Sequence, residues 1–344
     1  MKALRFFYAG FLLLTFGCNN KVVKNDLTWA ELYGKVKSVK TISYDAIDKF
    51  GEITKGNAPK GHFYFVVYNK RGDIIESCEF CNNGTLYTKS TYIHDNEGYV
   101  LKTINKQTKF KKKTLVLDNG QIDVSNAYRY IIDKNGNKKS VLDSIGTFET
   151  TSIIKYDDKR NVIECTNYTS TGKVKSKTTN KYDENNFISE SCDYDSVGNL
   201  KFKSIYKNNS KGNVIELKGI KSDGTIVRAW TYIYDLNGNE IEKKCYISPG
   251  NFENGKRVSK YDKNGKVIKI QFLPSDGRNC GWNTYKYDSK GNDKEYIGYN
   301  SDGSIEATYS YEYIYDKNGN WIKKIEFKNR FPQVVTERQI EYYD

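Results

Sequence analysis

Polar turn residues and alternating apolar residues follow each other at a fixed interval along most of this chain. A Tyr-Asp pair or an equivalent recurs at Tyr68-Asn69, His94-Asp95, Tyr156-Asp157, Tyr182-Asp183, Asn208-Asn209, Tyr234-Asp235, Tyr261-Asp262, Tyr287-Asp288, Tyr315-Asp316 and Tyr343-Asp344. From Asp157 onward the steps are 26, 26, 26, 27, 26, 28 and 28 residues. Self-similarity at such a period is the signature of a repeat architecture. The pattern therefore predicts a tandem array of repeats about 26 residues long.

Each pair opens a turn of the kind that joins two antiparallel strands. Asp235 to Asn239, for example, reads Asp-Leu-Asn-Gly-Asn. An aspartate caps such a turn through its side chain, and a glycine adopts positive φ without steric cost. A second glycine turn lies 12 residues after the first, as Gly224 does after Gly212. Two strands and two turns therefore make one hairpin unit.

Apolar residues between the turns form columns of equivalent positions. One column contains Ile163, Ile215, Ile241, Ile268 and Ile322, and another contains Phe80, Tyr168, Tyr194, Ile220, Tyr246, Leu273, Tyr299 and Phe327. In a stacked array such columns become ladders of like side chains, so neighbouring repeats share their stability. The fold class that we predict is all-β: an elongated tandem array of antiparallel β-hairpins, forming one continuous twisted sheet over residues 31–344.

The regularity lapses at two places, which we interpret as irregular insertions near residues 99–130 and 248–257. The second insertion carries Pro249-Gly250 and Asn254-Gly255. Insertions in repeat arrays project as loops, and loops on rigid scaffolds often carry binding. Simple decay of the repeat is the alternative explanation.

The first 17 residues read as an export signal. A basic start is followed by an apolar run from Phe6 to Phe16, which is shorter than the roughly 20 residues of a membrane span. The segment from Leu14 to Cys18 resembles a bacterial lipobox. We therefore predict a lipoprotein signal peptide over residues 1–17, lipidation of Cys18, and a tether over residues 18–30. An ordinary secreted protein and an uncleaved anchor are the alternatives.

The predicted lipid places the protein at the outer membrane, because Asn19 does not resemble an inner-membrane retention signal. Whether the tethered body faces the periplasm or the cell surface stays open. Composition agrees with an ordered β-protein, since 29 tyrosines and 16 phenylalanines outweigh 4 prolines and 1 methionine. The net charge of +13 comes from lysines interleaved with acids, which is typical of a solvated face. We expect no nucleic-acid partner.

Candidate chemistry is sparse. His62 and His94 are the only histidines, and nucleophilic catalysis usually needs a positioned base. The recurrent aspartates are explained by turn capping, and the string Asp316, Asn318 and Asn320 lacks the acid that a calcium loop needs at its twelfth position, Phe327. We expect no catalytic residues, no metal and no cofactor, and hence no enzyme.

The cysteines and tryptophans admit two interpretations each. Cys78, Cys81, Cys165, Cys192, Cys245 and Cys280 are expected to be small buried residues or to form occasional disulfides, with a metal site as the less favoured alternative. Trp29, Trp230, Trp282 and Trp321 are expected to pack in the interior, with a sugar-stacking platform on an exposed sheet face as the alternative. No binding residues can be chosen without knowing which face is covered.

The segments Tyr234 to Ile241 and Tyr315 to Ile322 resemble the YD repeats of the Rhs family, and the opening of the array resembles uncharacterised lipoproteins of Bacteroidetes-type bacteria. The resemblance implies a β-hairpin spiral. Long Rhs proteins wrap such a spiral around a C-terminal toxin, and the family has been described as carbohydrate-binding. Here the chain ends in repeat register at Tyr343-Asp344, so the toxin function is not carried over.

These observations predict a non-enzymatic, lipid-anchored envelope protein that acts as a binding or scaffold module for a glycan or protein partner. The alternatives are a cell-envelope glycan hydrolase with dispersed carboxylates, or a toxin-less relative of the Rhs polymorphic toxins. The membrane would be contacted through the N-terminal lipid.

Overall fold

The chain is almost entirely β-strand in the computed structural model, which describes residues 25–110, 115–116, 122–123, 130–132, 138–140, 144–246, 255–277 and 280–344. One short helix, α1 (Asp26–Trp29), precedes the strands. The strands before the predicted first insertion, and within it, are β1 (Val36–Lys49), β2 (Glu52–Pro59), β3 (Phe63–Tyr68), β4 (Ile74–Phe80), β5 (Leu86–His94), β6 (Val100–Phe110), β7 (Leu115–Val116), β8 (Ile122–Asp123), β9 (Tyr130–Ile132) and β10 (Lys138–Ser140).

The remaining strands continue the repeat to the C-terminus. They are β11 (Ser144–Tyr156), β12 (Val162–Thr169), β13 (Val174–Tyr182), β14 (Ile188–Tyr194), β15 (Leu200–Asn208), β16 (Val214–Lys221), β17 (Ile226–Tyr234), β18 (Glu240–Tyr246), β19 (Gly255–Tyr261), β20 (Val267–Pro274), β21 (Trp282–Tyr287), β22 (Asp293–Tyr299), β23 (Ile305–Tyr315), β24 (Trp321–Lys328) and β25 (Phe331–Tyr342). From β11 to β25 each strand pairs antiparallel with the next one in the chain, which confirms the predicted hairpins, and β11 also pairs with β6.

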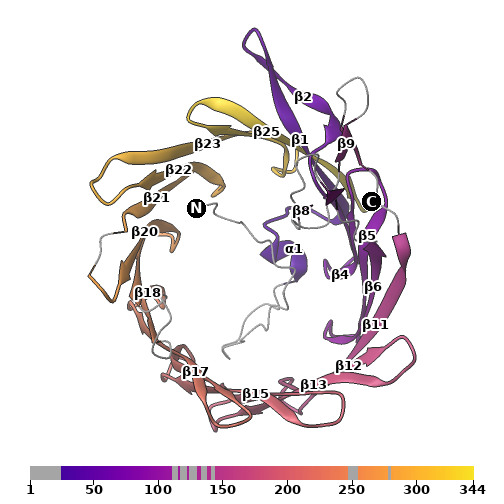
Figure 1. Ribbon diagram of the computed structural model, residues 1–344, viewed down its shortest axis with the longest axis vertical. Coiled ribbons are helices and arrows are strands. Elements are labelled where there is room, and N and C mark those ends of the chain that lie inside the picture. Colours follow the sequence, from indigo (N-terminus) through magenta and orange to yellow (C-terminus); the bar gives the residue numbers. More distant parts are fainter. Residues whose placement is uncertain are drawn as a thin grey trace.

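The sheet closes on itself. β1 pairs with β3 on one side and with β25 on the other, in register from Val36 opposite Tyr342 to Asp45 opposite Val334. Of the 21 strands in this sheet, β2 pairs only with β1, so 20 strands form a closed barrel, seen as a ring in Figure 1. The predicted open, elongated sheet is therefore wrong. Strand twist accumulates along a large sheet, and closure pairs the two edges that would otherwise expose backbone groups.

The turns that open with aspartate, or with asparagine at Asn69 and Asn209, all lie at one end of the barrel, which we call the aspartate rim. It comprises nine turns: 69–73, 95–99, 157–161, 183–187, 209–213, 235–239, 262–266, 288–292 and 316–320. In the turn at Asp235, the backbone N–H of Asn239 donates to the Asp235 Oδ1 atom at 2.8 Å, and Gly238 adopts φ +86°. This geometry confirms the predicted turn chemistry.

In several repeats the tyrosine just before the turn donates a hydrogen bond to the previous repeat. Tyr182, Tyr234 and Tyr287 donate to the carbonyl oxygens of Val162, Val214 and Val267 at 2.9, 2.8 and 2.8 Å. Where the chain has Asn208 in place of the tyrosine, its side-chain amide donates to the Ile188 carbonyl at 2.7 Å. The repeated tyrosine therefore serves as an inter-repeat hydrogen-bond donor, which explains why the pattern accepts asparagine there.

The N-terminal helix contacts the aspartate rim through the hydrogen bond from the Leu27 N–H to the Gly72 carbonyl oxygen, and Figure 1 shows α1 inside the ring. Leu27 packs with Val36, Val39 and Tyr68 in a small buried cluster. The carboxylate of Asp26 accepts from the Ile74 N–H at 2.6 Å, which fastens α1 to β4. Residues 25–30, which we expected to belong to the tether, thus include a helix docked on the inner wall. No helix among the described residues is both long enough and apolar enough to cross a membrane.

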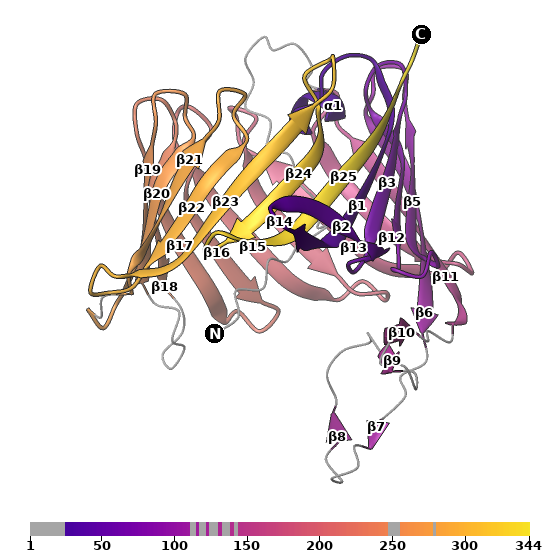
Figure 2. The same ribbon diagram turned by 90° about the horizontal axis from the view of Figure 1, so that it is seen from above.

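The insertions are only partly described. β6 continues the barrel to Phe110, so the irregular segment predicted near residues 99–130 begins later than expected. Two small ladders, β7 with β8 and β9 with β10, lie between β6 and β11 and project beyond the barrel (Figure 2). The segment near 248–257 lies outside the described residues as far as residue 254. The signal peptide and Cys18 also lie outside them, and remain predictions.

Candidate binding surface on the inner wall of the barrel

Strand alternation assigns every second residue to the inner or the outer face of the barrel. Val39 and its partner Val66 pack with Leu27 of α1, so this set faces inward. Thr336, Lys324 and Tyr313 belong to the same set, because directly opposed residues on paired strands share a face. Their sequence neighbours Glu337, Lys323 and Ile314 therefore face outward.

The outer face carries a ring of glutamates flanked by lysines. The glutamates stand seven residues after the first residue of a turn, at Glu76, Glu164, Glu190, Glu216, Glu242 and Glu295. Lys181 and Lys203, from the two strands beside Glu190, approach its carboxylate at 3.0 and 2.5 Å. These hydrogen bonds, first that of Lys203 and then that of Lys181, lower the pKa of Glu190 to about 2. The outward surface therefore carries charged groups around most of the circumference, and exposed isoleucines such as Ile233 and Ile314 lie between them.

The inner face carries a surface of aromatic rings across β21 to β24, which we call the aromatic band. It consists of Tyr285, Tyr296, Tyr309, Tyr311, Tyr313 and Trp321. Ring centres are 5.4 Å apart for Tyr285 and Tyr296, and 5.6 Å apart for Tyr296 and Tyr309. The band arises locally because Tyr309, Tyr311 and Tyr313 alternate along β23, and alternate residues of a strand share a face.

Cationic side chains lie over these rings. The Lys324 Nζ atom is 5.6 Å from the Tyr311 ring centre and 5.7 Å from that of Trp321. The Arg338 guanidinium lies 3.5 Å from the Trp321 ring centre. Burial, and then the nearby carboxylate of Asp293, raises the pKa of Tyr313, so its hydroxyl stays protonated at neutral pH. The surface thus offers rings, cations and hydroxyl donors together.

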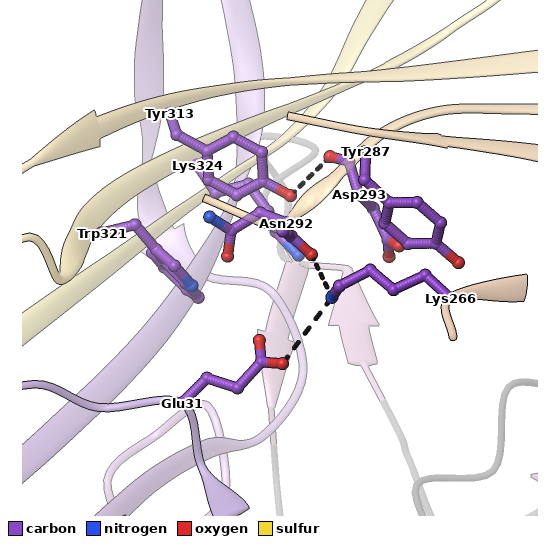
Figure 3. A pocket seen from close by; sticks show the side chains of 9 residues that line it. Glu31, Lys266, Tyr287, Asn292, Asp293, Tyr313, Trp321 and Lys324 are labelled. Atoms are coloured by element: carbon purple, nitrogen blue, oxygen red, sulfur yellow. Dashed lines mark hydrogen bonds and ion pairs between the residues drawn. The ribbon is translucent and has the colours of Figure 1, made fainter. Parts of the chain in front are cut away.

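A pocket of about 270 Å³ lies between the aromatic band and the N-terminal segment (Figure 3). It is lined by Glu31, Lys266, Tyr287, Gly291, Asn292, Asp293, Tyr313, Trp321 and Lys324. The Lys266 Nζ atom is 3.7 Å from Glu31 and 2.6 Å from the Gly291 carbonyl oxygen, and the Tyr313 hydroxyl donates to the Asp293 carbonyl at 2.8 Å. Three aromatic side chains, Tyr287, Tyr313 and Trp321, line the pocket together with a larger number of charged and polar groups.

A second ring and cation cluster faces inward from β17 and β18. The Lys243 Nζ atom lies 5.5 Å from the Trp230 ring centre and 5.4 Å from that of Tyr232. Burial, and then the charge of Glu240, raises the pKa of Tyr232 to about 12. The same combination of side chains therefore occurs at two places on the inner wall.

The tryptophans do not form a covered interior, contrary to expectation. Trp29 is 52% exposed on α1, while Trp230 and Trp321 are half-buried on the inner wall. Trp282 faces outward and stacks on Tyr299 with ring centres 5.0 Å apart. Sequence reasoning did not identify the tyrosines of the aromatic band as site residues, although their spacing at Tyr311, Tyr313 and Tyr315 is visible in the sequence.

The cysteines and histidines lie apart from the aromatic band. The six cysteines among the described residues are free thiols, of which Cys78, Cys81 and Cys192 are buried. His62 contacts the carboxylate of Glu79, and His94 ends β5 at the aspartate rim. Within the described ranges no three histidine, cysteine or acidic side chains gather as they would around a metal ion.

Comparisons with known proteins yield weak structural likenesses. No protein-family model matches the chain, and no curated protein matches it, so the resemblance to YD-repeat lipoproteins stays a prediction. A porin-like protein from Bacteroides uniformis has a TM-score of 0.36 at 9% identity, over 89% of this chain and 98% of that chain. A crystal structure containing TcdB2-TccC3 has a TM-score of 0.30 at 13% identity, over 85% of this chain and 19% of that chain. The Tc holotoxin pore of Photorhabdus luminescens has a TM-score of 0.18 at 10% identity, over 86% of this chain and 24% of that chain.

Proposed function

We propose that this chain is a non-enzymatic binding protein of the cell envelope, whose barrel is a water-filled chamber that holds a glycan on its inner wall. The observation that carries the proposal is the division of side chains between the two faces. The outer face has ion-paired lysines and glutamates, whereas the inner face has the aromatic band with its cations.

The charged outer face favours a barrel that is surrounded by water over one that spans a membrane. A membrane-spanning barrel has an apolar outward band, and a lysine there costs about 2–4 kcal/mol at the midplane. Each glutamate of the ring has at least one lysine partner, so the cost would be repeated around the barrel. In this proposal the membrane is reached through lipid on Cys18, and the barrel stands beside the bilayer.

The inner wall suits a saccharide chain. Sugar rings present C–H groups that pack on aromatic faces, while tyrosine hydroxyls and asparagine amides supply hydrogen bonds to their hydroxyl groups. Barrels of roughly 16–18 strands already enclose an aqueous channel, so a barrel of 20 strands has room for a polymer. A protein segment is the alternative occupant.

Two tryptophans provide a matched test of the inner wall. The full chain is screened on a glycan array, and the best ligand is titrated against Trp321→Ala and Trp282→Ala variants. Both substitutions remove an indole from a strand, but only Trp321 faces inward. We expect Trp321→Ala to weaken binding about tenfold or more, since stacked aromatic anchors commonly contribute about 1.4 kcal/mol or more. Equal affinity of the two variants, or no glycan bound by folded protein, would contradict the proposal.

Removal of the predicted lipidation site tests whether the barrel is held at the membrane only by its lipid. A Cys18→Ser variant should be recovered in the aqueous fraction of the envelope, whereas the parent chain stays with the membrane. Retention of Cys18→Ser in membranes after an alkaline wash would mean that the barrel itself is embedded.

A glycan hydrolase is the second candidate, because the carboxylates of Glu31 and Asp293 line one pocket. Incubation of the bound glycan with the protein distinguishes the two functions. Chain shortening that disappears in an Asp293→Asn variant would support the hydrolase.

A further inference from the structure

Arg338 is a half-buried cation of the inner wall with no acidic partner among the described residues. Its Nε atom is closed off from solvent without a hydrogen-bond partner. Arg71, Arg160 and Arg257 each form an ion pair with a carboxylate, whereas none joins Arg338 to an acid in the part of the chain that the structure describes. Burial lowers its pKa to about 10, so the guanidinium is still charged at neutral pH.

A charge in this position is unfavourable unless something compensates for it. Desolvating a guanidinium costs free energy, and stacking on the Trp321 ring recovers only part of this cost. An incoming anion beside the guanidinium would supply the missing counter-charge.

The surroundings define the kind of anion. Lys324, on the adjacent strand, lies 5.7 Å from the same indole ring and lines the pocket of Figure 3. Lys266, at the opposite side of the pocket, is already engaged with Glu31. Arg338 and Lys324 therefore both lie close to the Trp321 ring, so one indole is accompanied by two cations. A ligand that satisfies all three groups needs a ring for the indole and an anionic group beside it.

We propose that Arg338 and Lys324 bind the carboxylate of an acidic sugar whose ring stacks on Trp321, which makes the ligand an acidic glycan built of hexuronate units. The planar guanidinium matches a carboxylate with two parallel hydrogen bonds, and the ammonium of Lys324 adds a point charge. The inference rests on the proposed function, because it names the ligand class of the same inner wall.

The test compares an oligogalacturonate with the same oligomer after reduction of its carboxyl groups, each titrated calorimetrically against the full chain. We expect the acidic oligomer to bind at least tenfold more tightly, with an affinity that falls as salt rises. Lys324→Gln should lower the affinity for the acidic oligomer about tenfold, and Lys323→Gln should leave it unchanged. These two lysines are neighbours on β24 but face opposite sides of the wall, so they form a matched pair.

Arg338→Lys keeps the charge but loses the planar fork, so intermediate affinity is expected. Thermal unfolding of each variant shows whether it is folded, and the lysine pair decides the result if the Arg338 variant is unstable. Equal binding of both oligomers, with Trp321→Ala still weakening it, would overturn the acidic ligand and leave the glycan function intact. Failure of every glycan to bind the folded chain would remove both.

Discussion

Closure of the barrel can be tested by a disulfide across the seam between β1 and β25. Ser43 and Thr336 lie directly opposite each other, and their hydroxyl oxygens are 2.9 Å apart. Directly opposed residues on antiparallel strands have Cα separations compatible with a disulfide. A Ser43→Cys, Thr336→Cys double variant should therefore oxidise readily in the folded state. In an open array of hairpins these two positions would lie at opposite ends of the sheet.

The seam disulfide should also stabilise the fold by restricting the unfolded chain. The two positions are 293 residues apart, and the chain-entropy relation gives about 5–6 kcal/mol for such a loop, an upper limit because strain reduces it. Electrophoresis without reductant detects the closed loop as a faster band. Urea unfolding with and without reductant measures the gain, which we expect to be about 2 kcal/mol or more.

A register control makes the experiment decisive. Ser43→Cys combined with Glu337→Cys moves one thiol by a single residue and so to the other face of the sheet. This pair should stay reduced, as should the two single variants. Equal oxidation of both pairs, or of neither, would refute the closed register.

Three further outcomes follow from the repeat itself. Tyr234→Phe should lower the free energy of unfolding by about 1 kcal/mol. Tyr182→Phe should lower it by less, because the Asn180 amide also donates to the Val162 carbonyl that Tyr182 contacts. Urea unfolding of both variants measures the difference. Gly224→Ala should lower the free energy of unfolding by about 1 kcal/mol through backbone conformation alone, since φ is +86° and no atom lies within 4 Å of the added methyl group. Equal thermal midpoints for the variant and the parent protein would contradict this. Hydrogen bonds from the side chain and backbone of Asn239 lower the pKa of Asp235 in the folded protein. The Asp235 carboxylate therefore stabilises the fold above its unfolded pKa, and this stabilisation is lost as the pH falls through the folded pKa. Asp235→Asn should weaken this acid dependence of the free energy of unfolding, measured by urea titrations at several pH values.

The repeat unit and its turns were predictable from sequence because their physical causes are local. Asp235 and Gly238 meet within one turn, and the tyrosine and apolar columns express the period of two along each strand. These features determine antiparallel hairpins whatever the strands do at larger scale. The inter-repeat hydrogen bond of Tyr234 was not predicted, although its spacing repeats in the sequence.

Closure and the identity of the inner face were decided only by tertiary structure. Nothing local in Ser43 or Thr336 indicates that residues so far apart in the chain are partners, since their pairing depends on twist summed over 20 strands. The sequence also does not show which of Lys323 and Lys324 faces the interior of the barrel. Both faces of this single-layer wall carry half-exposed lysines and apolar groups, so alternation separates the two sets without saying which one surrounds the lumen.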